Sequence, residues 1–423
     1  MRKYGVFIIA VLVVAAAIVA SLLVPVTRPE PQTISLPVSR MLTCPVVAPD
    51  QGKTVVSVAD QETFVAGELN ALPSDPQTSA SLENPSKPVI VRGSATVSGV
   101  SVFTKTDNGT DHTMAVPCTP PITTGVWNGV STTSSSALVF TNVDTSSAVM
   151  DVFLYSETGP IAQLGLRDIS LAPGVTHVLP IDSGLVSSDT PVSVQIRASK
   201  GRVAAVLRTM GDQGYDWQLP QTSADTDLLI AGIPAGDGAR TLSIANNDPT
   251  NKAVITVEVI GESGSFAPLG LETIEIAASR VSTVDITQAL GGQASAVHLT
   301  SDRPVTATVV MSGDDMAGIS AQPGLNGAAV LPGLGGTLWV ANPGDQDTTL
   351  TVDSDDGSND FPIIAHTIMS VPFPSAGTVK ISTESEVLRT SLVLTDSGLS
   401  ILPISGGGIV TSVPAPRVAP GLG

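Results

Sequence analysis

Most of this chain alternates apolar and polar residues with a period of two, the pattern of strands that bury one face. In 255–259 every second side chain is apolar, and 271–276 follow the same pattern with one interruption. Successive side chains of a strand point to opposite faces, so the pattern predicts antiparallel sheets with one face on a core. The 39 glycines and 32 prolines are spread along the chain, as the turns between many short strands require.

One segment breaks this pattern with a continuous, uncharged apolar run from Gly5 to Val26. A helix needs about 20 such residues to cross a bilayer. Arg2 and Lys3 precede the run, which favours a cytoplasmic N-terminus and an exported C-terminal region. A cleaved signal peptide is the alternative, but a signal core has only about 7–15 residues, so the length favours a retained transmembrane helix.

The chain also contains internal repeats. Three strand-like runs end in Asn142, Asn246 and Asn342, at spacings of 104 and 96 residues, and the block 165–171 matches 270–276. Each repeat holds about six strand-like runs in a length that can bury its own core. The fold class that we predict is therefore all-β: one N-terminal transmembrane helix followed by tandem antiparallel β-sandwich-like repeats. A closed pseudo-symmetric or propeller-like packing of the repeats is the alternative.

These features divide the chain into six predicted segments. In order, they are the cytoplasmic N-terminus and anchor, a proline-rich stalk, an N-terminal β region, three β repeats and, within the last of these, a flexible tail. Their predicted bounds are 1–26, 27–40, 41–126, 127–218, 219–325 and 326–423.

Charge and cysteine content limit the possible partners and the cellular compartment of the protein. The formal net charge is −18, and no basic run follows residue 3, which argues against a nucleic-acid partner. The only cysteines are Cys44 and Cys118, at a spacing that matches no zinc or redox motif. Two cysteines in an exported chain predict one disulfide, and the prolines beside both place them at strand ends.

Several motifs together resemble a known group. They are the apolar N-terminal run, the stretch 118–121 leading to Trp127-Asn128-Gly129, the strand that ends in Asn142, and the turn 200–205. With these motifs the chain resembles an uncharacterised family of actinobacterial membrane-anchored extracytoplasmic proteins. The resemblance implies a cell-envelope setting and no known activity, and it assigns no functional residue.

The residues that could carry chemistry do not form a recognisable site. His112, His177, His298 and His366 lie far apart in sequence and in no metal motif; His298 alternates with apolar neighbours, which places it on the solvent face of a strand. The acidic stretch 353–360 has the wrong spacing for an EF-hand and predicts a polar hairpin. Gly261-Glu262-Ser263-Gly264 falls short of a nucleophile elbow. The recurring asparagines suit a structural role at strand ends. We therefore expect no catalytic residues, no cofactor and no metal site.

The resulting hypothesis is a non-enzymatic protein of the cell envelope with a structural or protein-interaction role. It would be a single-pass protein of the cell membrane, held by its N-terminal helix, with an extracytoplasmic C-terminal region and envelope proteins as partners. A glycan-binding module that contacts the cell wall is the alternative, with Trp127, Trp217 and Trp339 as its candidate aromatic side chains. An unrecognised enzyme is the third reading.

Overall fold

The computed structural model describes residues 33–35, 40–45, 51–59, 62–94, 96–107, 110–186, 188, 190–211, 214–325, 327–406 and 412–414. Val38–Ile409 form one compact unit. The two chain ends form the other unit, in which the short strands β1 (Thr33–Ser35) and β34 (Ser412–Pro414) pair in antiparallel fashion. Most of the predicted stalk and tail lies outside the described residues.

The all-β prediction is confirmed, and the predicted transmembrane helix is wrong. The one helix in the described part of the chain is the four-residue α2 (Thr287–Leu290), so no described helix is long and apolar enough to cross a membrane. The apolar run 5–26, on which that helix was predicted, lies outside the described residues. The length of the apolar run and its flanking charges had produced the prediction, whereas the described elements are strands, turns and the short α2.

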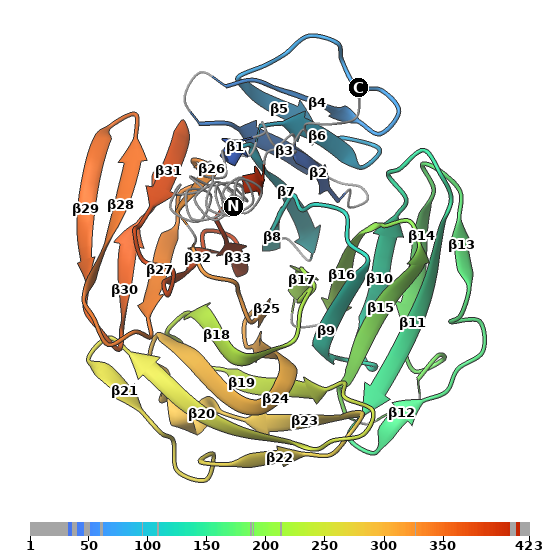
Figure 1. The fold of residues 1–423 in the computed structure, drawn as a ribbon, viewed down its shortest axis with the longest axis vertical. Coiled ribbons are helices and arrows are strands. Elements are labelled where there is room, and N and C mark those ends of the chain that lie inside the picture. Colours follow the sequence, from blue (N-terminus) through green and yellow to red (C-terminus); the bar gives the residue numbers. More distant parts are fainter. Residues whose placement is uncertain are drawn as a thin grey trace, which may run out of the picture. The chain divides into compact units, whose positions relative to one another are not determined.

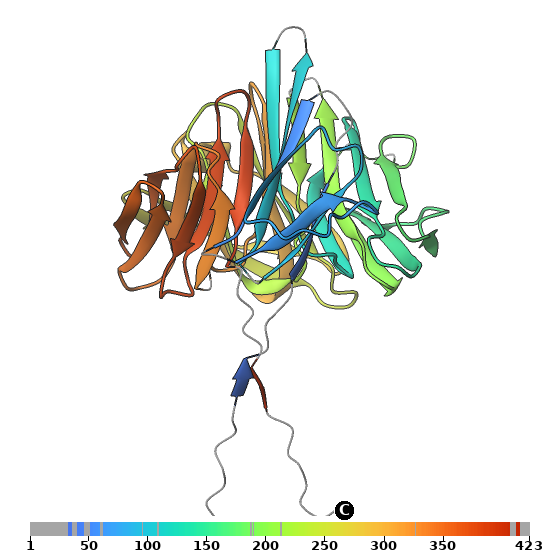
Figure 2. The same cartoon turned by 90° about the horizontal axis from the view of Figure 1, so that it is seen from above.

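The N-terminal module is a small sandwich of two sheets with strand orders β2-β6-β4 and β5-β3-β7-β8. Leu42, Phe64 and Val91 lie in its core. The hairpin of β7 and β8 extends beyond the neighbouring sheets (Figure 2). The strands of this module are β2 (Arg40–Cys44), β3 (Gln51–Ser57), β4 (Phe64–Glu68), β5 (Ser79–Glu83), β6 (Val89–Gly93), β7 (Ser98–Asp107) and β8 (Thr110–Pro117).

Repeat 1 is a sandwich of the sheets β14-β10-β16-β17 and β12-β11-β15-β9, with β13 also paired to β11. Its core contains Leu138, Met150 and Ile196, which are fully buried. The strands of repeat 1 are β9 (Thr124–Val130), β10 (Ser135–Thr141), β11 (Ala148–Ser156), β12 (Gly159–Ile161), β13 (Ile169–Leu171), β14 (Thr176–Ile181), β15 (Val192–Lys200), β16 (Ala204–Gly211) and β17 (Gly214–Gln218).

Repeat 2 has the same plan, but one long strand, β24, replaces the pair β15 and β16 of repeat 1. The first part of β24 pairs with β18 and β20, and its last part pairs with β19 and β25, so the strand belongs to both layers. The strands of repeat 2 are β18 (Asp225–Ile233), β19 (Ala239–Asn246), β20 (Ala253–Gly261), β21 (Gly264–Phe266), β22 (Ile274–Ile276), β23 (Arg280–Asp285), β24 (Ser295–Ser312) and β25 (Met316–Ser320).

Repeat 3 consists of the sheets β26-β31-β28-β29 and β30-β27-β32-β33. Its central register, Leu338 opposite Leu392, corresponds to Leu138 opposite Leu207 and Leu242 opposite Val309 in the other repeats. The strands of repeat 3 are β26 (Ala328–Pro332), β27 (Thr337–Asn342), β28 (Thr348–Ser354), β29 (Gly357–Ile363), β30 (Thr367–Pro372), β31 (Thr378–Ser382), β32 (Arg389–Leu394) and β33 (Ser400–Ile404).

Within Val38–Ile409 the four sandwiches follow one another around a closed ring (Figure 1). The first strand of each repeat contacts the next sandwich: β9 lies on β19 and β24, β18 on β27 and β32, and β26 on β3 and β7 of the N-terminal module. The ring closes where Leu69 and Ile90 of that module pack against Val143 of repeat 1. The sandwiches therefore follow one another in tandem along the chain and also close into a ring.

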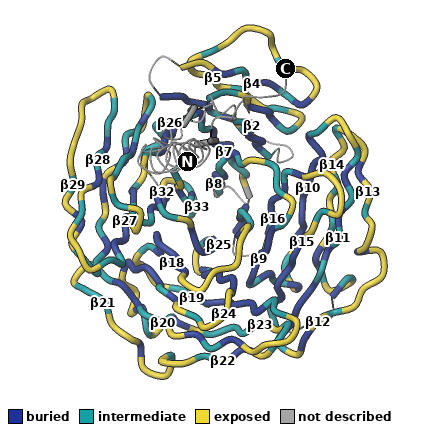
Figure 3. Tube along the Cα trace, in the orientation of Figure 1, coloured by how far each residue is buried: buried dark blue, intermediate teal, exposed yellow. Residues whose placement is uncertain are grey.

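The centre of the ring is formed by one edge strand from each sandwich. These inner strands are β8, β17, β25 and β33, and each contacts its two neighbours in turn. Buried residues concentrate inside the sandwiches, whereas exposed residues follow the outer loops (Figure 3). The centre is thus held by contacts between residues that are far apart in sequence.

Two glycines permit the close approach of successive repeats. Gly129 and Gly232 both have positive φ, at 71° and 93°. A Cβ on Gly129 would lie 2.7 Å from Val310 of repeat 2, and one on Gly232 would lie 2.5 Å from Ser391 of repeat 3. Any larger residue would therefore strain the backbone and push the sandwiches apart.

The recurring asparagines hold the loops at the ends of equivalent strands. Asn246 donates through Nδ2 to the carbonyl oxygens of Asn251 and Ile276, and its Oδ1 accepts the backbone N–H of Asp248. Asn142 and Asn342 make the corresponding three contacts in repeats 1 and 3. All three are buried, which supports the structural role expected from the sequence.

Replacing Asn246 by alanine is expected to lower the free energy of unfolding by about 3 kcal/mol, because buried backbone groups would lose their partners. Denaturant unfolding measures the change. Asn359→Ala, at an exposed position of β29, is the matched control and should stay within about 0.5 kcal/mol of the parent. Equal effects of the two substitutions would contradict the structural role.

Candidate functional site

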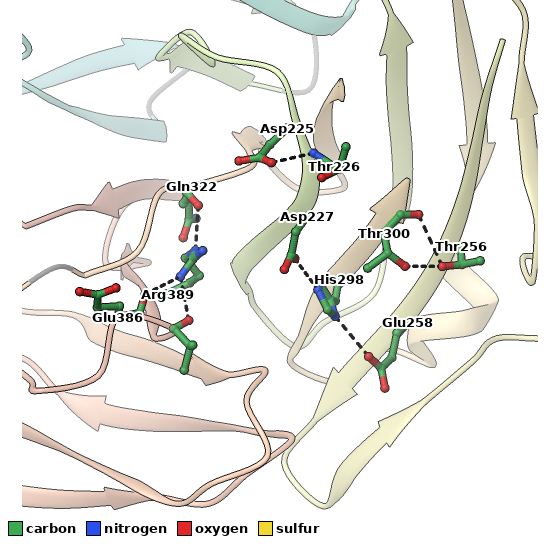
Figure 4. A network of polar contacts seen from close by, with 11 residues as sticks. Asp225, Thr226, Asp227, Thr256, Glu258, His298, Thr300, Gln322, Glu386 and Arg389 are labelled. Atoms are coloured by element: carbon green, nitrogen blue, oxygen red, sulfur yellow. Dashed lines mark hydrogen bonds and ion pairs between the residues drawn. The ribbon is translucent and has the colours of Figure 1, made fainter. Parts of the chain in front are cut away.

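A network of charged and polar side chains lies where repeat 2 meets repeat 3 (Figure 4). His298 is on the central strand β24, between β18 and β20. Its Nε2 lies 2.7 Å from Oδ1 of Asp227, and its Nδ1 lies 3.3 Å from Oε2 of Glu258. Val297 and Leu299 are in the core of repeat 2, so His298 faces away from that core, as alternation predicts.

The neighbouring groups of this network are also paired. Arg389 donates through Nε to the carbonyl oxygen of Gln322 at 2.9 Å. Burial lowers the pKa of Arg389, whereas the negative charges of Asp227 and Asp225 raise it. Burial raises the pKa of Glu258, but hydrogen bonds from Ser265 and His298 outweigh it and leave that pKa below its ordinary value. The network thus joins repeat 2 to repeat 3 through charge.

The imidazole of His298 is already engaged on both sides. Both ring nitrogens of His298 are engaged by carboxylates, so neither is available to take a proton from a substrate hydroxyl. The hydroxyls of Thr256 and Thr300, drawn beside it, hydrogen-bond to each other (Figure 4). Alternation along the strand predicts the face on which His298 lies but not its two carboxylate partners, because Glu258 and Asp227 lie on strands 40 and 71 residues away.

A second polar cluster lies among the inner strands. Oδ2 of the buried Asp216, on β17, accepts the backbone N–H of Gly318 on β25 at 2.7 Å. Burial raises the pKa of Asp216 to about 7 and the nearby Asp315 also raises it, while hydrogen bonds from Gly318, Gln218 and Trp217 oppose the shift. This carboxyl therefore belongs to the contact between repeats 1 and 2.

Asp315 extends that cluster to the other two sandwiches. Its Oδ2 accepts the backbone N–H of Leu399 in repeat 3 at 2.7 Å. Its Oδ1 lies 3.7 Å from Nδ1 of His112 on β8 of the N-terminal module. One carboxylate thus bridges three sandwiches at the centre of the ring, and its contacts are structural.

The other residues singled out from the sequence lie apart from one another. His177 packs against Phe140, and His366 pairs with Asp345 at 2.9 Å. The acidic stretch 353–360 forms the β28–β29 hairpin, and Ser263 lies in the exposed turn between β20 and β21. Among the described residues, no group of three His, Cys, Asp or Glu is placed to hold a metal ion.

The predicted disulfide is present between Cys44 and Cys118. Cys44 ends β2, and Cys118 follows β8, so the bond joins the two sheets of the N-terminal module at strand ends. Both residues are buried in the core of that module. Cys44 and Cys118 are therefore structural.

The three tryptophans do not form an exposed aromatic platform. Trp127 is fully buried and donates from Nε1 to the carbonyl oxygen of Gln218 at 3.0 Å. Trp217 is buried among the inner strands, and Trp339 packs half-buried between repeats 2 and 3. A glycan site on exposed tryptophans, the alternative raised by the sequence, has no support in these positions.

Two leucines on outer loops are, in contrast, almost completely exposed. Leu164 is 98% exposed and Leu269 is 96% exposed. Each precedes a glycine with a φ of 81°, Gly165 or Gly270, in the equivalent loop of repeats 1 and 2. These loops follow β12 and β21 at the outer edge of the ring in Figure 1. Single exposed leucines are common, but this one recurs at the same position in two repeats.

Comparison with known proteins gives a family and no activity. The family described as a family of unknown function (DUF5719) matches residues 91–362. No curated protein matches the chain. A solved structure reported as "Ca2+-stabilized adhesin helps an Antarctic bacterium reach out and bind ice" aligns with 84% of this chain and 94% of its own at 13% identity. Its TM-score is 0.11, so the likeness carries no argument.

Proposed function

Because the chain belongs to this family of unknown function (DUF5719), its role has to be argued from its own residues, and we propose a non-enzymatic interaction protein of the cell envelope. In this proposal the ring is a rigid scaffold, its outer loops bind other envelope proteins, and its origin is actinobacterial, as the sequence resemblance implies.

The disulfide supports a location outside the cytoplasm. Cys44 and Cys118 are bonded and buried, and no free cysteine occurs among the described residues. Structural disulfides persist in oxidising compartments, whereas thiols in the cytosol are kept reduced. A ring held by such a bond suits the exterior of the cell.

The use of polar side chains inside the ring supports a non-enzymatic role. His298 is held between two carboxylates, and Asp216 and Asp315 bind backbone N–H groups of neighbouring sandwiches. An acid–base site needs a group that is poised to exchange a proton with a substrate. His298 is instead held within repeat 2, and Asp216 and Asp315 connect one sandwich to the next.

The observation that carries the interaction role is the repeated exposed leucine. Leu164 and Leu269 occupy equivalent loops, and neither contributes to the core of its repeat. An apolar side chain held in water at two equivalent positions is suited to enter an apolar pocket of a partner protein. The ring fixes the separation of the two loops, so a partner with two such pockets, or two copies of one partner, would gain avidity.

The test is photo-crosslinking on isolated cell envelopes. A photoreactive amino acid is placed at the exposed Gln163, beside Leu164, in the parent and in the double variant Leu164→Asp, Leu269→Asp. We expect a discrete protein adduct in the parent and its loss in the double variant, with unchanged thermal unfolding because both leucines are exposed.

The matched control for charge is Arg167→Asp, at another exposed position in the same loop. It should leave the adduct in place. An adduct that survives the double variant, or no adduct in the parent, would contradict the proposed contact. Turnover of an envelope substrate that survives repurification would contradict the non-enzymatic role.

A further inference from the structure

A cavity of about 530 Å³ lies where the four inner strands end. Its lining includes Pro117 at the end of β8, Leu219 after β17, Ala321 after β25 and Ile404 at the end of β33. All four sandwiches therefore contribute to one site, and its volume lies in the range of about 300–1,000 Å³ typical of small-molecule pockets.

Prolines recur around this space. Six of them line the cavity, in strands β8 and β33 or in the segments that follow β8, β17 and β25: Pro117, Pro120, Pro121, Pro220, Pro323 and Pro403. A proline has no backbone N–H, so it cannot extend a sheet ladder across the centre of the ring. Their rings also present hydrocarbon to the cavity without adding a hydrogen-bond donor.

Apart from the amide of Gln322, the rest of the lining is apolar or hydroxylated, with one charged exception. Val97, Trp217, Ile319 and Ile401 supply apolar surface from the four sandwiches, and threonine and serine hydroxyls lie among them. Arg40 is the one charged residue among the described lining residues. The chain has a net charge of −18, whereas the described lining of the cavity holds one cation and no carboxylate. The charge in the cavity is therefore opposite in sign to that of the chain as a whole.

Arg40 is suited to receive an anion. It is half-buried, and burial lowers the pKa of its guanidinium. The lower pKa means that the charged guanidinium has lost part of its contact with water, which destabilises it. Arg40 already has an interaction within the protein, but a guanidinium carries five N–H donors and can donate to a ligand as well. A guanidinium binds a carboxylate or a phosphate best, because two of its N–H groups can donate to two oxygens at once.

From this combination we propose that the cavity binds a single-chain anionic amphiphile, with its hydrocarbon chain among the prolines and aliphatic residues and its anionic end at Arg40. The apolar lining favours the chain, because burying hydrocarbon removes it from water. The ligand is a further function of the ring and does not depend on the leucine loops.

Val330 offers a way to fill the cavity. It lines the cavity from β26, where its neighbours Ala329 and Leu331 lie in the core of repeat 3 and Val330 does not. Alternation along the strand therefore directs Val330 to the other face. Val330→Trp should fill part of the space, and Thr222→Trp, at an exposed lining position, should obstruct it without touching a core.

The experiment is isothermal titration of the full chain, stripped of lipid, with dodecanoate below its micellar concentration. We expect saturable binding at one site and at least tenfold weaker binding in Val330→Trp and Thr222→Trp, each checked by circular dichroism to be folded. Because Thr222 is exposed, its variant keeps the test valid if Val330→Trp fails to fold. No saturable binding to the parent, or equal binding in a folded tryptophan variant, would overturn the proposal.

The role of Arg40 is tested with a neutral ligand of the same chain length. Arg40→Gln should weaken dodecanoate by about tenfold, the usual effect of losing a hydrogen bond to a charged group. Arg40→Lys should restore part of it, and dodecanol should bind the parent and Arg40→Gln alike. Equal loss for both ligands in Arg40→Gln, or dodecanol binding the parent as tightly as dodecanoate, would overturn the assignment of an anionic end.

Discussion

Replacing both Cys44 and Cys118 by alanine is expected to lower the free energy of unfolding by about 4 kcal/mol. The disulfide closes a loop with a sequence separation of 74 residues. A crosslink over a loop of that length restricts the unfolded chain, and the chain-entropy estimate gives about 4 kcal/mol. Guanidinium unfolding, with the midpoint and slope fitted separately, measures the change.

The reduced parent protein provides the control for this substitution. Reductant should shift the unfolding midpoint of the parent toward that of the double variant and leave the double variant unchanged. Because the loop contains nearly all of the N-terminal module, limited proteolysis of the double variant should cut this module first. Coincident unfolding curves of the oxidised parent and the double variant would contradict the stabilising role.

The parts of this fold that sequence could predict are those with local patterns. Period-two alternation identified the strands, because a half-buried strand must alternate along its own length. The three asparagines were visible as a repeat, and some of their contacts lie close by in sequence, from Asn142 to Ser146 and from Asn246 to Asn251. Their contacts with Leu171 and Ile276, 29 and 30 residues away, were not visible. The disulfide was predictable because the chain has only two cysteines.

The closure of the ring was not predictable from such patterns, because it depends on contacts between repeats. Asp216 meets Gly318 across 102 residues, and Thr113 meets Ser397 across 284. One signal was present: Gly129 and Gly232 lie near the ends of the first strands of repeats 1 and 2, β9 and β18. They mark a close approach of backbone to a neighbour, which in the structure is the next repeat.

The apolar run 5–26 shows the limit of reading one segment alone. Its length and flanking charges predicted a membrane helix, but that prediction used no information from the rest of the chain. The described residues contain no helix of that kind. The cavity was also missed, because its lining comes from all four sandwiches, and the lining residues noted from the sequence, Cys118, Trp217 and the prolines, had been assigned other roles.

The stability of the protein is expected to depend on pH through Asp216. Burial raises the pKa of this carboxyl from an ordinary value of 3.8 to about 7. The folded protein therefore holds the proton more tightly than the unfolded chain does. Its favourable contribution is complete below about pH 4 and is lost as the pH rises through 7, because the unfolded chain ionises first.

The change is measured as the difference between the parent and Asp216→Asn, whose neutral amide can still accept the N–H of Gly318. Between pH 4 and pH 7 the parent should lose about 3 kcal/mol of stability relative to this variant. Asp314→Asn, at an exposed position, is the control and should follow the parent throughout. If the stability difference between the parent and Asp216→Asn stayed constant over this range, the buried carboxyl would not be the titrating group.

Asp216 joins β17 to β25, so its ionisation should loosen the contact between repeats 1 and 2 before the sandwiches themselves unfold. Hydrogen exchange at the backbone of β25 should then rise above pH 7 in the parent and not in Asp216→Asn.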